Sequence, residues 1–187
     1  SIDYREKAPA SAHRDLYLDE EGNVIPGMST LGATAVGVPG TIAGITEVHA
    51  KMGSLPFDEI LAPVISLAKN GVVVTEKQAK SMASQREIIA KISGEQSLFA
   101  QHYVAGDTIK YPALATTLAA IAKGGRKAFY EGEMAEKIAA FIQERGGFIT
   151  REDLANYEAV WRQPVIFNYK DLRIISMSPP SSGGVTM

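Results

Sequence analysis

Apolar residues in the middle of the chain recur at three- and four-residue intervals, the spacing of one face of an amphipathic helix. The pattern starts after Pro39-Gly40 and is interrupted mainly by glycine and proline, which are common at helix ends. Pro63 lies inside one stretch, so we expect it to kink or divide that helix. The expected helices run from Gly40 to Gly53, from Pro56 to Asn70, from Thr75 to about Ile92, from Pro112 to Ala122 and from Phe129 to Glu144.

Capping residues mark some of the expected helix starts. Gln78 follows Thr75 by three positions, as Asp153 follows Thr150, and this spacing favours a capping box. In a capping box the threonine hydroxyl accepts a backbone amide while the later side chain bonds back to the cap. Ile149 and Leu154 flank the second box and are placed to form a hydrophobic staple, so we expect a helix after Thr150.

Strand patterns occur towards the two ends of the chain. Residues 165–169 and 172–177 are rich in β-branched residues around Lys170-Asp171 and predict a hairpin, and residues 16–25 predict two short strands around an acidic turn. The predicted fold class is therefore α+β, predominantly helical, with a C-terminal β-hairpin. We treat residues 1–187 as a single segment with a loop-rich start (1–38), a helical part (39–157), and strands with a Pro-Pro-Ser-Ser-Gly-Gly turn (158–187).

Composition narrows the function classes. Apolar residues make up 45% of the 187 residues and charged residues 21%, an ordinary globular balance. The 19 basic and 21 acidic residues give a formal charge of −2, which argues against nucleic acid as a partner. No apolar run reaches the roughly 18 residues that a membrane span needs. The absence of cysteine excludes disulfides, thiolate metal sites and a cysteine nucleophile.

Several short motifs are better explained as structural or chance features than as functional sites. His13, His49 and His102 are too far apart for a helical ligand pair, so no metal site is predicted. The glycine-rich residues 32–41 open a helix, but no lysine follows them, which favours a tight turn over a phosphate cradle. Ser66 and Lys69 match an SxxK pattern whose companion motifs are absent, and chance is the better account.

Two serine positions remain as weaker candidates. An N-terminal serine can be a nucleophile whose own amine is the base, but nothing identifiable near Ser1 supplies an oxyanion hole. Ser181-Ser182-Gly183-Gly184 can supply hydroxyls or backbone amides to a site, or form a tight turn packed beneath one. The residues alone leave both interpretations of this turn open.

Arg5 is the most informative single residue. It lies in the run Asp3-Tyr4-Arg5-Glu6-Lys7-Ala8-Pro9, where an arginine beside acidic residues usually forms a surface ion pair worth little free energy. The functional alternative is a guanidinium fork that binds a substrate carboxylate in bidentate fashion. From the residues alone, the surface ion pair is favoured.

The ordered set of motifs resembles the γ-glutamyltranspeptidase family, also called glutathione hydrolases. Each motif is weak alone, but together they span essentially the whole chain in the order found in the family. Ser178 departs from the pattern, because many members have a third proline there, and Asp171 replaces a frequent turn glycine. The motifs are residues 3–9 (DYREKAP), 37–44 (GVPGTIAG), 61–68 (LAPVISLA), 129–132 (FYEG), 146–154 (GGFITREDL) and 179–184 (PPSSGG).

The resemblance implies an N-terminal-nucleophile hydrolase with a four-layer αββα sandwich, made as a precursor that cleaves itself into two subunits. It implies transfer or hydrolysis of the γ-glutamyl group of glutathione and related amides, to acceptor amino acids or water, through a threonine acyl-enzyme. Similar enzymes use the arginine matching Arg5 to bind the substrate α-carboxylate. Thr30, Thr34 and Thr41 lie outside the family's cleavage context, so we assign the nucleophile to none of them and expect it beyond this chain.

The same resemblance sets the remaining expectations. The chain is expected to be an internal piece of the large subunit, inactive alone, with the remainder of that subunit and the small subunit as partners. It implies no cofactor, and a periplasmic or secreted location. We expect such a piece to expose apolar surface, and therefore to self-associate or to be partly loosened. The alternatives are a cephalosporin or poly-γ-glutamate acylase of the same superfamily, a non-catalytic helical binding module, and a serine hydrolase using Ser1 or Ser181.

Overall fold

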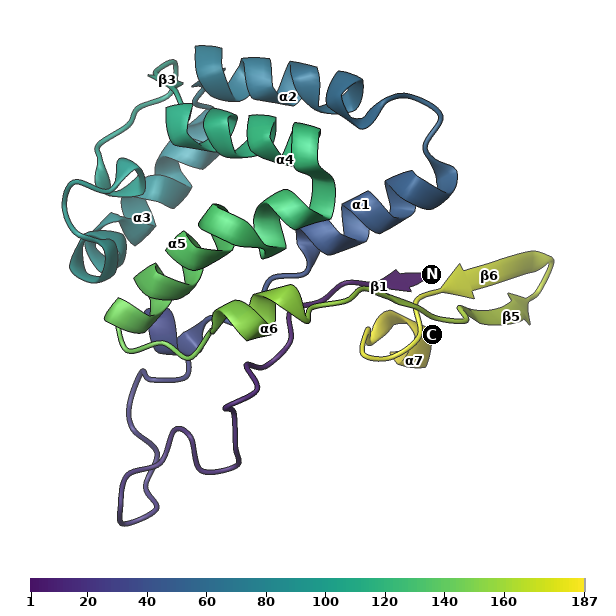
Figure 1. Ribbon diagram of the computed structural model, residues 1–187, viewed down its shortest axis with the longest axis horizontal. Helices are drawn as coiled ribbons and strands as arrows, with labels where there is room; N and C mark the ends of the chain where they lie inside the picture. Colours follow the sequence, from purple (N-terminus) through teal and green to yellow (C-terminus); the bar gives the residue numbers. More distant parts are fainter. Residues whose placement is uncertain (187) are drawn as a thin grey trace.

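Helix α4 lies at the centre of the helical part of the computed structural model, which describes residues 1–186 (Figure 1). It contacts α1, α2, α5 and α6, so most of the helical packing is organised around it. The α3 helix packs instead against a short 3₁₀ helix at Leu98–Ala100 and buries no residue of its own. The helices are α1 (Thr41–Met52), α2 (Phe57–Asn70), α3 (Glu76–Ser93), α4 (Pro112–Tyr130), α5 (Gly132–Glu144), α6 (Arg151–Ala155) and α7 (Gly183–Thr186).

The glycine pair at residues 124–125 interrupts the helix that starts at Pro112, as predicted, although α4 as a whole runs on to Tyr130. Gly125 leaves the helical region at φ 56° and ψ −141°, and the chain then resumes a helical path as far as Tyr130. Glycine tolerates this positive φ, so the pair separates two helical stretches of α4 at a kink. The next helix consequently begins at Gly132 and not at Phe129.

Pro63, in contrast, does not divide its helix. Helix α2 runs continuously from Phe57 to Asn70 with the proline inside it. Leu61 and Ala68 are buried on either side of the proline, and α2 packs along α4. We attribute the continuity to this packing, which holds both halves on one partner and compensates for the lost backbone donor.

The strands form three small antiparallel pairs. Strand β1 (Ile2–Asp3) pairs with β4 (Val160–Trp161), and β2 (Val72–Val73) pairs with β3 (Thr108–Ile109). The predicted C-terminal hairpin is confirmed as β5 (Val165–Tyr169) and β6 (Leu172–Ser176), which extend away from the helices (Figure 1). Residues 16–25 form only an isolated bridge between Leu18 and Val24, so two strands were not formed there.

Both predicted capping boxes are present. The Gln78 amide donates to Thr75 Oγ1 at 3.3 Å, and the Thr75 amide donates to Gln78 Oε1 at 2.9 Å. At α6 the Asp153 amide donates to Thr150 Oγ1 at 3.0 Å, and the Thr150 amide donates to Asp153 Oδ2 at 2.8 Å. These bonds satisfy amides that a helix start otherwise leaves unpaired.

One buried cluster joins α1, the end of α4, α5 and α6. It includes Ile149 and Leu154, the pair expected to form a staple, and two fully buried tyrosines. The chain is thus mostly helical with small antiparallel sheets, as the sequence predicted. The cluster consists of Val38, Ala43, Tyr130, Ala135, Ala139, Ile149, Leu154 and Tyr157.

Candidate functional site

Arg5 lies between two extended backbone contacts near the start of the chain. Strand β1 precedes it and pairs with β4, while Lys7 follows it and forms a two-way backbone bridge with Val38. The Lys7 amide donates to the Val38 carbonyl at 3.1 Å, and the Val38 amide donates to the Lys7 carbonyl at 2.8 Å. These contacts fix the backbone on both sides of Arg5 against segments distant in the sequence.

The guanidinium of Arg5 is much less constrained than its backbone. The side chain is 57% exposed, and its nearest carboxylate, Glu6 Oε1, lies 3.9 Å from Nη2. Nη1 donates a long bond of 3.5 Å to the carbonyl of Pro180, which lies 175 positions away in the Pro-Pro-Ser-Ser-Gly-Gly turn. Because these contacts are long, most of the guanidinium's donors remain free to bind another carboxylate.

Arg5 borders an open cavity of about 480 Å³. The wall includes Ile2 to Glu6, the start of α1 and Met177, so the cavity joins the first and last parts of the chain. A guanidinium and a helix N-terminus on the same cavity both favour a bound anion. The Arg5 side of this cavity is therefore suited to binding a carboxylate, while Asp3, Glu6 and Thr41 also line the wall.

Glycines let the backbone approach closely at this wall. A Cβ placed on Gly40 would lie 2.0 Å from the hydroxyl oxygen of Tyr157 and 2.1 Å from the carbonyl oxygen of Tyr4. A Cβ on Gly44 would lie 2.2 Å from the ring of Tyr4. The glycine-rich segment before α1 is thus packed against protein on this side, which favours the tight-turn interpretation over a phosphate cradle.

Asp3 supports Arg5 from within the first strand. Its Oδ1 accepts the Arg5 amide at 3.2 Å, and its Oδ2 accepts Arg162 Nε at 2.8 Å, while the carboxylate side chain is only 11% exposed. The hydrogen bond from Arg162, followed by that from the Arg5 amide, lowers the pKa of Asp3 below its usual range. Asp3 therefore stays ionised and holds the strand end in place.

Tyr157 supports Arg5 from the other side, and the sequence analysis missed it. Its hydroxyl donates to the Arg5 carbonyl at 2.6 Å. Burial, with the nearby Tyr130, Asp3 and Glu6, raises the pKa of Tyr157 to about 12, so the hydroxyl stays protonated as a donor. Nothing near Tyr157 in the sequence indicates this role except its position just after a short capped helix, because its partner Arg5 lies 152 positions away.

Among the serines considered from the sequence, Ser1 and Ser66 lack the geometry of a nucleophile. The N-terminal amine of Ser1 and its Oγ both donate to the carbonyl of Arg162, at 3.1 and 3.2 Å, so the amine is not directed at the hydroxyl. Ser66 Oγ accepts a bond from Asn70 Nδ2 at 3.0 Å within α2. Ser181 lies in a turn, where its amide donates to the Ser178 carbonyl at 3.2 Å.

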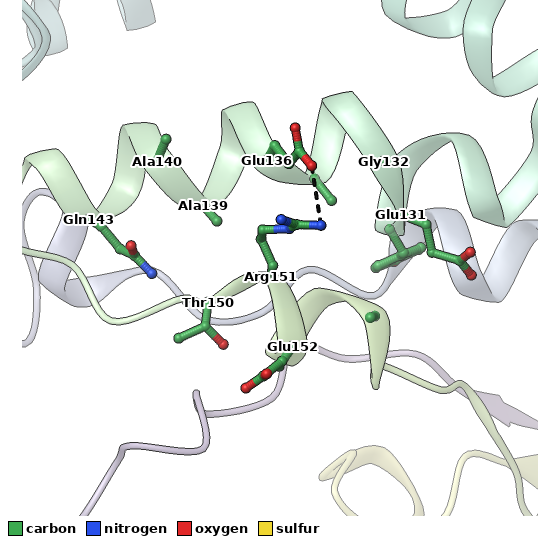
Figure 2. A pocket seen from close by; sticks show the side chains of 12 residues that line it. Glu131, Gly132, Glu136, Ala139, Ala140, Gln143, Thr150, Arg151 and Glu152 are labelled. Carbon is green, nitrogen blue, oxygen red and sulfur yellow. Dashed lines mark ion pairs between the residues drawn. The ribbon is translucent and has the colours of Figure 1, made fainter.

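A larger cavity, of about 660 Å³, lies away from Arg5 between α5 and α6. Figure 2 shows Arg151 of α6 reaching across it to Glu136 of α5, with Arg151 Nη2 3.2 Å from Glu136 Oε1. Both side chains are more than half exposed, so the ion pair contributes little. The Thr150 hydroxyl on this wall is engaged with Asp153 in the capping box, and size alone does not make the cavity the site.

Other site types find no support in the part of the chain that the structure describes. Among residues 1–186, no cluster of three or more histidine, aspartate or glutamate side chains is placed to hold a metal ion. Over the same residues, no helix is both long and apolar enough to cross a membrane. The imidazole of His49 bonds to a residue close in the sequence, with Nε2 2.8 Å from the Leu55 carbonyl oxygen.

Comparison with known proteins decides the family. The sequence model described as Gamma-glutamyltranspeptidase matches residues 1–187, the whole chain. The chain belongs to this family. The glutathione hydrolase proenzyme of Pseudomonas aeruginosa is 38% identical over 188 residues, covering 100% of this chain and 33% of that proenzyme. The chain thus spans about a third of the length of the curated γ-glutamyltranspeptidase relatives that it matches.

Solved structures of similar proteins share the fold. The crystal structure of Helicobacter pylori γ-glutamyltranspeptidase matches with a TM-score of 0.94 at 42% identity, over 98% of this chain and 54% of that one. The cephalosporin acylase from Bacillus halodurans matches with a TM-score of 0.80 at 27% identity, over 95% of this chain and 34% of that one. The same architecture therefore occurs in proteins named for different substrates.

Proposed function

We propose that this chain forms the donor-binding part of an enzyme that hydrolyses or transfers the γ-glutamyl group of glutathione and related amides. The observation that carries the proposal is the Arg5 guanidinium, which borders an open cavity with most of its donors free. Membership of a family whose relatives are named glutathione hydrolases gives the cavity its substrate class. Arg5 would bind the α-carboxylate of the donor in bidentate fashion.

The chemical step itself would be supplied by sequence outside these residues. A threonine hydroxyl, activated by its own α-amine, would attack the γ-carbonyl carbon and release the amine of the donor. Water or an acceptor amino acid would then resolve the acyl-enzyme. The partners proposed for this chain are accordingly the rest of the large subunit and the small subunit of one proenzyme, because the curated relatives are about three times its length.

Substitution of Arg5 tests the proposed binding role. In the full-length protein, we expect Arg5→Gln to raise KM for γ-glutamyl-p-nitroanilide by about 10- to 100-fold, the cost of losing hydrogen bonds to a charged group. The kcat should change much less, because the α-carboxylate is bound equally in the ground and transition states. Arg5→Lys should fall between, since lysine keeps the charge and loses the fork.

Arg14 provides the matched control. It is another exposed arginine of the same loop-rich region and pairs with its neighbour Asp15 at 3.0 Å. Arg14→Gln should leave both kinetic constants unchanged. An unchanged KM in Arg5→Gln would refute the binding role. The isolated 187-residue chain should not cleave the same substrate, and cleavage by that chain would overturn our assignment of the nucleophile elsewhere.

The structural match to a cephalosporin acylase supports a second candidate function. In that case the same cavity would hold the carboxylate of a different acyl group, and the guanidinium would keep its role. A panel that compares γ-glutamyl amides with glutaryl and cephalosporin side-chain amides separates the two. Preference for donors that carry an α-amino group would favour the γ-glutamyl assignment.

A further inference from the structure

The hydroxyl of Tyr157 reaches the backbone of Arg5 from the buried core. The donated bond is 2.6 Å long, and Tyr157 is 2% exposed. Its ring is stacked on that of Tyr130, with centroids 5.7 Å apart and planes 11° from parallel. Because the ring is buried and stacked, its hydroxyl is held in one position. Solvent does not compete with the Arg5 carbonyl as its hydrogen-bond partner.

Tyr130 is itself fixed to the start of α1. Its hydroxyl donates to the Pro39 carbonyl at 2.7 Å and accepts the Ala43 amide at 3.2 Å. The close approach of Gly40 to the Tyr157 hydroxyl and the Tyr4 carbonyl brings the same helix start against Arg5's neighbour. The stacked tyrosines therefore connect the cavity wall made by α1 with the wall made by residues 2–6.

Both polar groups of the Arg5 backbone are consequently bound by side chains. Asp3 Oδ1 accepts the amide and the Tyr157 hydroxyl donates to the carbonyl, whereas the guanidinium makes only long contacts. The direction from which the guanidinium projects into the cavity thus depends on these two bonds. A bidentate pair with a carboxylate is sensitive to displacements of about 1 Å.

We propose that Tyr157 is a positioning residue for substrate binding: its hydroxyl sets the backbone of Arg5 so that the guanidinium meets the donor α-carboxylate. This inference rests on the proposed function of Arg5. Tyr157 does not contact the reacting atoms. It acts through the Arg5 carbonyl, and its effect should therefore appear in donor binding.

A double-mutant cycle in the full-length protein tests this positioning role. Tyr157→Phe removes the hydroxyl and keeps the stacked ring. We expect it to raise KM for γ-glutamyl-p-nitroanilide about three- to tenfold, the usual effect of one hydrogen bond, with kcat changed by less than about twofold. In an Arg5→Gln background the same substitution should change KM little, because the group that it positions is gone.

Tyr17→Phe serves as the control for a purely structural effect. Tyr17 is partly buried and donates a comparable hydroxyl bond of 3.0 Å to the Thr34 carbonyl, and neither residue lines this cavity. It should leave KM unchanged, with any loss in Tm showing the cost of deleting such a bond. An equal KM increase in Tyr17→Phe would overturn the inference, as would additive effects of Tyr157→Phe and Arg5→Gln.

The outcomes also separate the two proposals. If Arg5→Gln leaves KM unchanged, the proposed binding role of Arg5 fails, and the positioning role fails with it. If Arg5→Gln raises KM while Tyr157→Phe does not, only the positioning role fails. A raised KM in both single variants without a further increase in the double variant supports both.

Discussion

At Arg5 the backbone is held more firmly than the side chain. The amide and carbonyl are each bonded to a side chain from the protein, and the guanidinium is left exposed beside the cavity. A fixed backbone with an exposed side chain favours ligand binding, because the conformational entropy of the backbone has already been lost on folding and is not lost again on binding. It also explains why the isolated motif at residues 3–9 could not reveal its role.

Asp3 gives a prediction about pH. Its pKa is lowered in the folded protein, so it contributes stability that is present above its unfolded pKa of about 3.9 and is lost as the pH falls through the folded value. Asp3→Asn should therefore lower Tm near neutral pH and make the fall in Tm below about pH 4 shallower. Thermal unfolding at a series of pH values measures both effects.

The control for Asp3 is the exposed carboxylate of Asp15, which pairs only with its neighbour Arg14. Asp15→Asn should leave Tm at neutral pH within about 1 °C of the parent, as expected for a surface pair. A Tm-versus-pH curve for Asp3→Asn that runs parallel to that of the parent would contradict the stabilising role of the ionised carboxylate.

The sequence singled out Arg5, whose binding role stays a prediction, but not the residues that support it. Arg5 was singled out because its motif matches a family pattern, and local reasoning had favoured a surface ion pair. Asp3 lies in the same motif, yet its main partner Arg162 is 159 positions away. Tyr157 likewise contacts Arg5 across 152 positions. Pairings of this kind follow from tertiary packing, which a single sequence pattern does not encode.

Among the elements, the two capping boxes have the same local bonds in different surroundings. The box at Thr150 starts α6, which buries Leu154, and Asp153 Oδ1 also accepts the Ala10 amide at 2.7 Å. The box at Thr75 starts α3, which buries no residue. Loss of a cap should therefore affect global stability at α6 and only local order at α3.

Paired alanine substitutions test this difference. Thr150→Ala should lower the free energy of unfolding by about 1–2 kcal/mol, and Thr75→Ala by about 0.5 kcal/mol or less. Urea unfolding measures the global effect, while hydrogen exchange should show faster exchange in the first turn of α3 for Thr75→Ala. Equal losses of unfolding free energy in the two variants would show that α3 is coupled to the core.

Helix ends were predicted as well as helix starts, because α1, α2, α3 and α5 all end at or next to the expected residue. Thr75 and Thr150 carry their own hydrogen-bonding partners within three residues, so the signal is local and the structure confirms it. Proline is a breaker only when the surrounding packing allows a break. Here Gly125 interrupts the helical path within α4, whereas α2 continues through Pro63 and packs along α4.

At the scale of the whole molecule, the C-terminal hairpin carries exposed apolar side chains. Ile166 of β5 and Ile175 of β6 are directly opposite each other and are 48% and 63% exposed. The hairpin extends away from the helices (Figure 1). Paired, solvent-exposed β-branched residues on a two-stranded sheet are unfavourable in water and promote contact with another surface.

The isolated 187-residue chain should therefore self-associate through its hairpin. Sedimentation velocity over a range of concentrations should show a rising average mass, and the double substitution Ile166→Lys and Ile175→Lys should reduce it by adding charge to the exposed face. Met52→Lys is the control, since Met52 is 65% exposed at the end of α1 and lies outside the hairpin. A parent chain that stays monomeric at every concentration would refute the prediction, whereas equal loss of association in both variants would place the contact outside the hairpin.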